Sequence, residues 1–577
     1  MLFLVVVITS FLQMTTVGAI PLVVSALQSP EAIAEHSAYK LAAQYLGIDS
    51  IPVVDFAILF LLLVFVFSNL MRVLVIYLRS RIVRDFTIDL SDRLFGCYIN
   101  APYTFHLGTN TALAIRNLTT EVSATVSNFN SIVSLFMALM TIILIFALLI
   151  SQDPLLTAFV MFAGIVGSAI VFVMTRRVSS KMGKIVHIEQ AQMIKIINHA
   201  FGGIRDIQIL NRLDWFSEQF SQSLKKFCQS KLKQTLVSGV IQPLIQSAGL
   251  LALMVIVFIA YVSDGGMAEL LPTIALFGAA LHRLMPNLSE AISTAGQLYF
   301  GAAGTEAVVG DIRKFSQPGE YLHIEETTGD VSAPVQFVNS IELQNIRYTY
   351  PEANRASLID ISLHCNRGEM IGLVGETGSG KSTIVDIILG LITPESGAVL
   401  VDDLDVTGIE NRWQGTVGMV SQSVFLMDET IRTNVAMGLP EDKVDDEKVW
   451  RALGLAQIDD VVKKLPLGLD EVVGERGIRL SGGERQRLAL ARAILSEPSV
   501  LIMDEGTSAL DNQTEKRLMN AIKSLRSNYT LIMVAHRLSS VSECDRLYVI
   551  EAGQIAACGS YDELVKSSEK FRALAFA

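Results

Sequence analysis

The 577-residue chain is 51% hydrophobic and only 18% charged. Soluble globular proteins carry about 25% charged residues, so this composition excludes a wholly soluble protein and predicts that part of the chain lies in lipid. The net charge of −11 argues against nucleic acid as a partner. The five dispersed cysteines, without a CxxC pair, argue against a disulfide framework and a zinc site.

The first 300 residues contain six apolar stretches that are each long enough to cross a bilayer, which takes about 20 helical residues. The predicted spans lie near residues 2–27, 52–78, 127–151, 153–175, 237–262 and 266–300. No basic residue precedes Lys40, and the first stretch is longer than the apolar core of a signal peptide. It is therefore predicted to be a transmembrane helix.

The orientation in the membrane follows from the basic residues of the loops. Lysine and arginine are concentrated in the two long polar stretches at 79–126 and 176–236, whereas the short loops contain only Lys40. The positive-inside rule therefore places both long stretches and both termini in the cytoplasm. We predict a multi-pass protein of the cell (inner) membrane whose helices continue into the cytosol.

A polar linker at 312–338 separates the predicted transmembrane domain, 1–311, from a soluble domain at 339–577. The soluble part alternates strand and helix patterns, which predicts an α/β fold. Within it the apolar strand MIGLVG leads directly into GETGSGKST and a helix, which is the setting that a phosphate-binding P-loop requires. The predicted ligands of ATP in this loop are Gly375, Glu376, Thr377, Gly378, Ser379, Gly380, Lys381, Ser382 and Thr383, and the Ser382 hydroxyl is also predicted to bind Mg²⁺.

Three further strands end in residues that fit nucleotide hydrolysis. SVLIMDE ends in Asp504, predicted to hold Mg²⁺ through water, and Glu505, predicted to polarise the attacking water. YTLIMVAHR places His536 after a strand, where a histidine is more often structural but here fits a γ-phosphate sensor. TVGMV precedes Gln422, a predicted ligand of Mg²⁺ or of the attacking water.

A second phosphate-binding pattern, LSGGE, begins a predicted helix at 480–484. Together with GETGSGKST, Gln422, VLIMDE, SALD and His536, it resembles the ATP-binding cassette (ABC) transporters. Six spans followed by one cassette resemble an ABC exporter half-transporter over essentially the whole chain. The resemblance implies an α-helical six-span membrane domain with helices extended into the cytosol, and an α/β P-loop cassette with a helical subdomain.

The resemblance also implies roles for single residues, with ATP and Mg²⁺ as the ligands. Tyr350 would stack on adenine, although a strand aromatic packing inward is the alternative, and Asp511 would link two nucleotide sites. The signature would face the γ-phosphate held by the partner's Lys381, so the working unit would be a homodimer or a dimer with a homologous half-transporter. The signature residues are Ser481, Gly482, Gly483 and Glu484, the last standing where the family usually has glutamine. Stretches 117–126 and 197–220 would form helices at the loop tips that dock onto the cassettes.

The last predicted span carries three polar residues, Arg283, Asn287 and Glu290, on one helical face. Because charge at membrane depth is costly, they either line a path for an anionic substrate or pair with acids on neighbouring helices. The segment LHRLMPNLSEAI is similar to bacterial lipid-linked oligosaccharide flippases of the PglK type. We therefore predict an ATP-driven exporter or flippase of an amphipathic, lipid-linked glycan or polyanionic substrate. A lipid or multidrug exporter and a non-pumping ATP-gated channel or regulator are the alternatives.

Overall fold

The computed structural model describes residues 2–28, 30, 52–262, 267–316, 334–351, 353–504, 520, 522–523, 525–526, 529–535 and 541–576. The chain divides into two compact units. The first comprises residues 1–101 and 108–324, and the second comprises residues 102–107 and 325–577.

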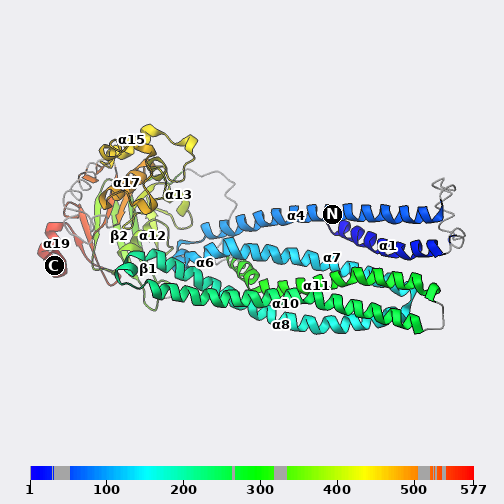
Figure 1. The fold of residues 1–577 in the computed structure, drawn as a ribbon. Coiled ribbons are helices and arrows are strands. Elements are labelled where there is room, and N and C mark those ends of the chain that lie inside the picture. The colour runs from blue at the N-terminus through cyan, green and yellow to red at the C-terminus, as the bar shows by residue number, and fades with distance from the viewer. Residues whose placement is uncertain are drawn as a thin grey trace. The chain divides into compact units, whose positions relative to one another are not determined.

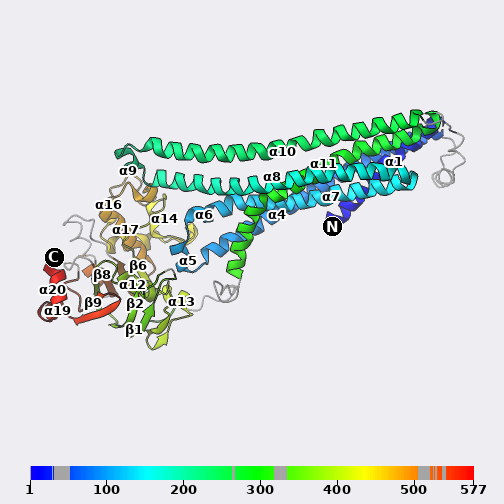
Figure 2. The same cartoon turned by 90° about the horizontal axis from the view of Figure 1, so that it is seen from below.

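The first unit is a bundle of long helices that lie alongside one another (Figures 1 and 2). The long helices are α1 (Leu2–Gln28), α4 (Val53–Ile99), α7 (Val122–Gln152), α8 (Pro154–Gly202), α10 (Leu213–Val262) and α11 (Met267–Ser316). The short elements are α6 (Thr111–Arg116), a π-helix at Asn117–Glu121, and α9 (Ile204–Ile209). Among the described residues, five stretches are long and apolar enough to cross a membrane: Leu2–Gln28, Val53–Ile99, Thr111–Gln152, Pro154–Gly202 and Leu213–Phe258. Helix α11 overlaps the sixth predicted span but is not one of these five.

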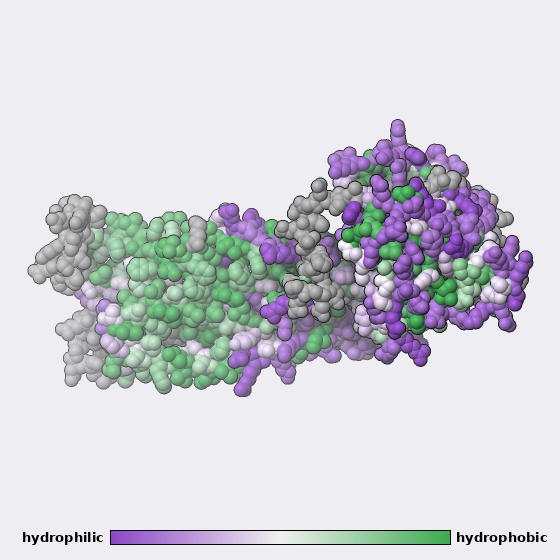
Figure 3. All heavy atoms as spheres, turned by 180° about the vertical axis from the view of Figure 1, so that it is seen from behind, coloured by the Kyte–Doolittle hydropathy of each residue, from purple (hydrophilic) through white to green (hydrophobic). Residues whose placement is uncertain are grey.

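Apolar side chains cover most of the visible surface of this unit, and hydrophilic side chains gather toward one end of its helices (Figure 3). Helices α8 and α10 have 49 and 50 residues, which corresponds to about 75 Å at 1.5 Å per residue. The hydrocarbon core of a bilayer is only about 30 Å thick. These helices therefore extend far beyond the lipid, as the sequence predicted.

The structure corrects the position of the first predicted docking stretch. Residues 117–126 do not form a loop tip: they run from the π-helix into α7, and Asn117, Glu121, Val122 and Val126 are buried in the first unit. The turn after α4 is made by residues 100–110, which include α5 (Tyr103–Gly108). The second stretch, 197–220, does contain a tip, because α9 and the residues that follow it join α8 to α10 (Figure 2).

The second unit is an α/β domain built on two sheets. The six-stranded sheet has the order β10-β9-β3-β8-β7-β6, in which the last five strands run parallel and β10 pairs antiparallel to β9. Its strands are β3 (Met370–Val374), β6 (Val417–Val420), β7 (Val500–Asp504), β8 (Thr530–Ala535), β9 (Arg546–Glu551) and β10 (Gln554–Gly559). An antiparallel sheet of order β2-β1-β4-β5 contains β1 (Ser340–Tyr348), β2 (Leu358–Asn366), β4 (Ser396–Val401) and β5 (Leu404–Asp405).

Helices complete this unit. They are α12 (Lys381–Ile388), α13 (Glu410–Gln414), α14 (Ile431–Val435), α15 (Asp446–Leu455), α16 (Asp459–Val462), α17 (Gly482–Leu495), α19 (Tyr561–Ser567) and α20 (Glu569–Phe576), with 3₁₀ turns at Glu441–Lys443, Gly468–Asp470 and Glu475–Gly477. Strand β3 is buried along its whole length, which explains its unbroken apolar run. Because parallel strands end at one edge of the sheet, the loops that follow β3, β6 and β7 meet there.

Candidate functional site

The phosphate-binding loop lies between β3 and α12 and requires glycine at defined positions. Gly378 and Gly380 have φ values of +81° and +111°, in the left-handed region that glycine tolerates best. A Cβ at Gly380 would lie 2.7 Å from Leu358 Cδ2, and a Cβ at Gly375 would lie 2.2 Å from the carbonyl oxygen of Ile550. The two glycines therefore allow the loop to pack against neighbouring chain segments.

Lys381 is buried at the start of α12, with 4% of its surface exposed. Its Nζ donates hydrogen bonds to the carbonyl oxygens of Gly375 and Glu376, both at 2.8 Å. The hydroxyl of Ser379 is buried and has no hydrogen-bond partner among the described residues. A buried ammonium held over the loop, beside an unsatisfied hydroxyl, fits the binding of an anionic phosphate group.

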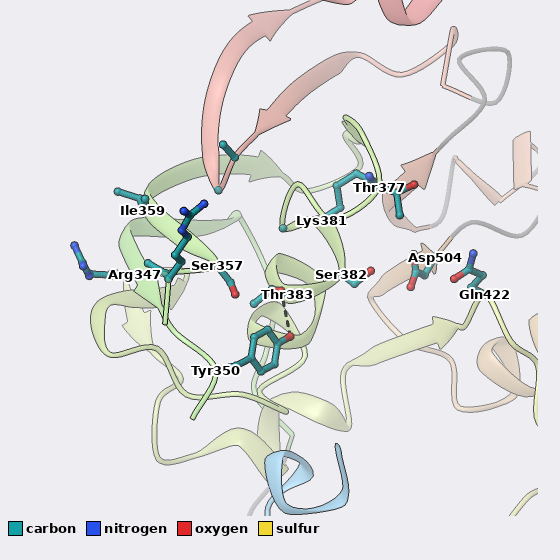
Figure 4. Close-up of a pocket in the computed structure, with 16 residues that line it drawn as sticks. Arg347, Tyr350, Ser357, Ile359, Thr377, Lys381, Ser382, Thr383, Gln422 and Asp504 are labelled. Carbon is teal, nitrogen blue, oxygen red and sulfur yellow. Dashed lines mark hydrogen bonds between the residues drawn. The ribbon is translucent and has the colours of Figure 1, made fainter. Parts of the chain in front are cut away.

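The loop borders a cavity of about 1030 Å³ (Figure 4). Tyr350 lies at one end of it, and its hydroxyl is 3.2 Å from Thr383 Oγ1. Its ring forms a T-shaped pair with Tyr348, at a centroid distance of 5.1 Å. Among the candidate site residues, those that line this cavity are Tyr350, Thr377, Gly378, Gly380, Lys381, Ser382, Thr383, Gln422 and Asp504.

The three predicted metal ligands, Ser382, Gln422 and Asp504, come from the ends of three different segments and line the same end of the cavity (Figure 4). The hydroxyl, the amide and the carboxylate of these three side chains supply the hard oxygen donors that Mg²⁺ prefers. Asp386, on α12, does not line the cavity, but burial and then the charge of Asp504 raise its pKa from 3.8 to about 6.

Arg347 and Arg355 also line the cavity, and the sequence did not single them out. Both lie around the loop between β1 and β2, which carries no phosphate-binding pattern. Their only signal in the sequence is a positive charge within a few residues of Tyr350. Both can attract a polyanion to this cavity.

The signature residues begin α17. Ser481 is the N-cap, and its hydroxyl accepts a hydrogen bond from the Glu484 backbone N–H at 3.4 Å. Glu484 Oε2 in turn accepts from the backbone N–H and the hydroxyl of Ser481, both at 2.8 Å. This is a capping box. Ser481, Gly482, Gly483 and Glu484 do not line the cavity that holds Lys381.

Three predicted residues, Glu505, Asp511 and His536, lie outside the residues that the structure describes. Asp504 is the last described residue of β7, and Ala535 is the last residue of β8. These strands are neighbours in the sheet, with Asp504 opposite Val534. The register therefore brings the ends of the two predicted catalytic strands to one edge.

In the first unit, Arg283 and Asn287 on α11 are half-buried and Glu290 is exposed. Asn287 Nδ2 donates to the Arg283 carbonyl oxygen at 2.7 Å, within the same helix. Among the described residues, neither Arg283 nor Glu290 forms an ion pair. Whether these residues line a substrate path or pair with other acids stays a prediction.

Comparisons with known proteins cover both units. A family model described as ABC transporter transmembrane region matches residues 2–278, and one described as ABC transporter matches residues 358–508. The ATP-dependent lipid A-core flippase of Cupriavidus metallidurans is 30% identical over 498 residues, which span 85% of this chain and 81% of the relative. The protein of that name from Burkholderia orbicola is 34% identical over 373 residues, or 64% of this chain and 61% of the relative.

A solved structure of a bacterial Atm1-family ABC exporter with ATP bound has a TM-score of 0.79 to this chain. It covers 99% of this chain and 97% of its own, at 21% sequence identity. At that identity the likeness shows the fold alone. It extends over the helical bundle and the α/β domain together.

Proposed function

This chain belongs to the ABC transporter family, and from that premise we propose that it is an ATP-driven exporter or flippase of the inner membrane. The main support is the cavity lined by Lys381, Ser382, Gln422 and Asp504, in a chain that also contains helices long and apolar enough to cross a membrane. An ATP site on the same chain as those helices is what coupling hydrolysis to transport requires.

In the proposed nucleotide site, Lys381 exchanges its two carbonyl contacts for phosphate oxygens, which are stronger acceptors because they are charged. Tyr350 offers a ring face for adenine. Mg²⁺, when bound by Ser382, Gln422 and Asp504, would neutralise charge on the phosphates. We assign the polarisation of the attacking water to Glu505 and the sensing of the γ-phosphate to His536 from their positions in the sequence.

We propose that the working unit is a homodimer, or a dimer with a homologous half-transporter. The signature residues Ser481, Gly482 and Gly483 begin a helix, where the dipole and the free N–H groups favour an anion. They do not line the cavity of their own chain. A second copy would bring this helix start to the phosphate held by Lys381, so that each site is completed by the partner.

The tip between α8 and α10 supports the same assembly. Ile209 and Leu210 are 71% and 67% exposed there, although the lengths of α8 and α10 carry this tip well beyond the bilayer. Exposed apolar residues in water mark a docking surface. We propose that the stretch 197–220 docks onto a cassette and conveys its motion to the helices.

We propose an amphipathic, lipid-linked glycan or polyanionic lipid as the substrate. The relatives are named lipid A-core flippases, and Arg283, in the last span predicted from the sequence, has no ion-pair partner among the described residues. In this proposal Arg283, Asn287 and Glu290 form one polar face along the substrate path. A charged side chain in the membrane is costly unless it serves such a contact.

The test is ATP hydrolysis and lipid flipping by the full chain in proteoliposomes. We expect hydrolysis that is lost in Glu505→Gln and stimulated by a phosphorylated, lipid-linked glycan. Absence of turnover in the intact protein would favour the ATP-gated channel or regulator instead.

Arg283→Ala should lower flipping of the anionic lipid while Arg283→Lys retains it. Unchanged flipping in Arg283→Ala would remove the assignment of this residue, and equal stimulation by uncharged drugs would favour a multidrug exporter.

A further inference from the structure

A buried polar network joins four long helices of the first unit near their cytoplasmic ends. Its members are Tyr98 on α4, Arg116 on α6, Asn117 and Glu121 on the π-helix that leads into α7, His187 on α8, and Asp311 on α11. His187 follows Pro154, the first residue of α8, by about 33 residues, or roughly 50 Å of helix. That distance places the network beyond the hydrocarbon, which is about 30 Å thick.

One half of the network connects α4, the π-helix and α11. The Tyr98 hydroxyl donates to Asp311 Oδ2 at 2.5 Å, and Asn117 Nδ2 donates to the same oxygen at 2.7 Å. Asn117 Nδ2 is also 3.1 Å from the Tyr98 hydroxyl. The Asp311 carboxylate thus receives two donors from two other elements, which compensates for its removal from water.

The other half connects the π-helix to α8. Glu121 Oε1 lies 3.3 Å from Arg116 Nε and 3.0 Å from His187 Nδ1, and the side chains of Glu121 and Arg116 are 5% and 7% exposed. Both contacts are within ion-pair distance but outside hydrogen-bond geometry. They are electrostatic contacts that fix the three groups less firmly than directed hydrogen bonds do.

His187 lies between a buried cation and a buried anion. Its Nε2 lies 3.5 Å from Arg116 Nη2, and its Nδ1 lies 3.0 Å from Glu121 Oε1. The imidazole therefore connects the guanidinium of Arg116 on one side with the carboxylate of Glu121 on the other.

Glycines bring α11 against this network. A Cβ at Gly304 would lie 2.1 Å from Glu121 Oε2, so no other residue fits there without displacing the carboxylate. A Cβ at Gly183 on α8 would lie 2.1 Å from the carbonyl oxygen of Phe300 on α11. These glycines therefore allow α11 to pack closely against the network and against α8.

The contact between Glu121 and His187 joins the α8–α10 hairpin to the rest of this unit. Among the described residues, it is the one contact between an acidic and a basic side chain within 4 Å that does so, because Lys226–Glu189 lies within the hairpin. It also lies on a π-helix, a distortion that occurs frequently at functional sites.

We propose that Arg116, Glu121 and His187 form a latch that holds the α8–α10 hairpin against α4, α7 and α11, and that this latch opens and closes during the transport cycle. The proposal rests on the ATP-driven cycle proposed above. Because the network lies beyond the hydrocarbon, water can hydrate its polar groups when the helices separate, which lipid could not do. The contact is therefore suited to an element that switches between two states.

The sharpest test compares Gly304→Ala with Gly310→Ala. Both changes replace glycine by alanine on α11 and raise helix propensity equally, but a Cβ at Gly310 meets no atom within 4 Å. Only Gly304→Ala pushes the Glu121 carboxylate from its partners. Spin labels on Asp92→Cys of α4 and on Cys228 of α10 would report the distance across the latch, with the other cysteines replaced and labelled chains diluted into unlabelled ones. Asp92 and Cys228 are both exposed.

We expect the fraction of molecules that show the label-to-label distance of the closed latch to fall by ~10-fold or more in Gly304→Ala. This fraction should be unchanged in Gly310→Ala. Equal populations in the two variants, with and without ATP, would overturn the latch. So would a single distance in the wild type under every nucleotide condition. ATP hydrolysis in the same samples tests the proposed function separately: absent turnover with a shift specific to Gly304→Ala would reject the pump and retain the latch.

His187 provides a second pair of variants in case Gly304→Ala does not fold. The amide of His187→Gln can still accept from Arg116 and donate to Glu121, whereas His187→Leu can do neither. We expect His187→Leu to shift the distances as Gly304→Ala does and His187→Gln to resemble the wild type. Identical behaviour of the two variants would show that packing, rather than the polar contact, holds the hairpin.

Discussion

The ionised form of Asp386 is disfavoured in the folded cassette, so replacing this carboxylate by a neutral side chain should stabilise the cassette. It lies partly buried on the helix that follows the phosphate-binding loop, and burial and then the charge of Asp504 raise its pKa from 3.8 to about 6. The folded state therefore binds more protons than the unfolded chain between those two values. Stability falls as the pH rises through this window and stays lowered above it.

The magnitude follows from the shift. A change from 3.8 to about 6 corresponds to an upper limit of ~3 kcal/mol at neutral pH. Because Asp386 is partly exposed, solvent screening reduces this, and we take roughly half, ~1.5 kcal/mol. For a unit of this size that free energy corresponds to a rise of about 3–6 °C in the midpoint of thermal unfolding. At about pH 5 the folded-state group is mostly neutral, and roughly half of the gain remains.

The assay is thermal unfolding of nucleotide-free Asp386→Asn protein in detergent at about pH 8 and about pH 5. Asp442→Asn, which changes an exposed carboxylate of the same unit, is the matched control and should leave the midpoint unchanged at both pH values. We expect Asp386→Asn to raise the midpoint at both, and more at the higher pH. A lowered midpoint at the higher pH, or a larger gain at the lower pH, would refute the reasoning.

Two further predictions concern the nucleotide site and its support. Lys381→Ala should weaken binding of a fluorescent ATP analogue by ~30-fold or more, because it removes a buried cation from the phosphate position; affinity within a few-fold of wild type would contradict this role. Asn434 is fully buried, and its amide contacts the backbone of Met427 and Thr430, so Asn434→Leu should destabilise the cassette by ~3 kcal/mol or more in thermal unfolding. The exposed Asn411→Leu is its control, and equal effects of the two changes would argue against the hydrogen-bonding explanation.

The phosphate-binding loop could be read from the sequence because all its parts are contiguous. A buried strand, a glycine-rich turn and a helix start follow one another from Met370 to Thr383, so local spacing determines where Lys381 lies. The fold class followed in the same way, from apolar stretches and alternating strand and helix patterns.

Contacts between distant segments could not be predicted in this way. The pKa of Asp386 is raised by burial and then by the charge of Asp504, more than a hundred residues away, and nothing in its own neighbourhood indicates the approach of Asp504. The prediction that 117–126 forms a loop tip, which came from the family resemblance, was wrong, because Glu121 is buried by contacts with α6, α8 and α11. The capping box did have a signal, since Ser481 and Glu484 follow the S-x-x-E pattern.

That capping box has a consequence for ATP binding, because Glu484 is an anion beside the serine that is proposed to meet the partner's γ-phosphate. The Ser481 hydroxyl and backbone N–H are both within 2.8 Å of Glu484 Oε2, so a phosphate must compete with a carboxylate for the same donors. Glutamine preserves the capping box but removes the like charge. Glu484→Gln should therefore tighten ATP-dependent dimerisation by ~5-fold, from a screened repulsion of about 1 kcal/mol, with a smaller gain at high salt. Light scattering or cross-linking of the Glu505→Gln background with ATP would measure it. Weaker dimerisation would mean that Glu484 serves the interface through its charge rather than opposing the phosphate.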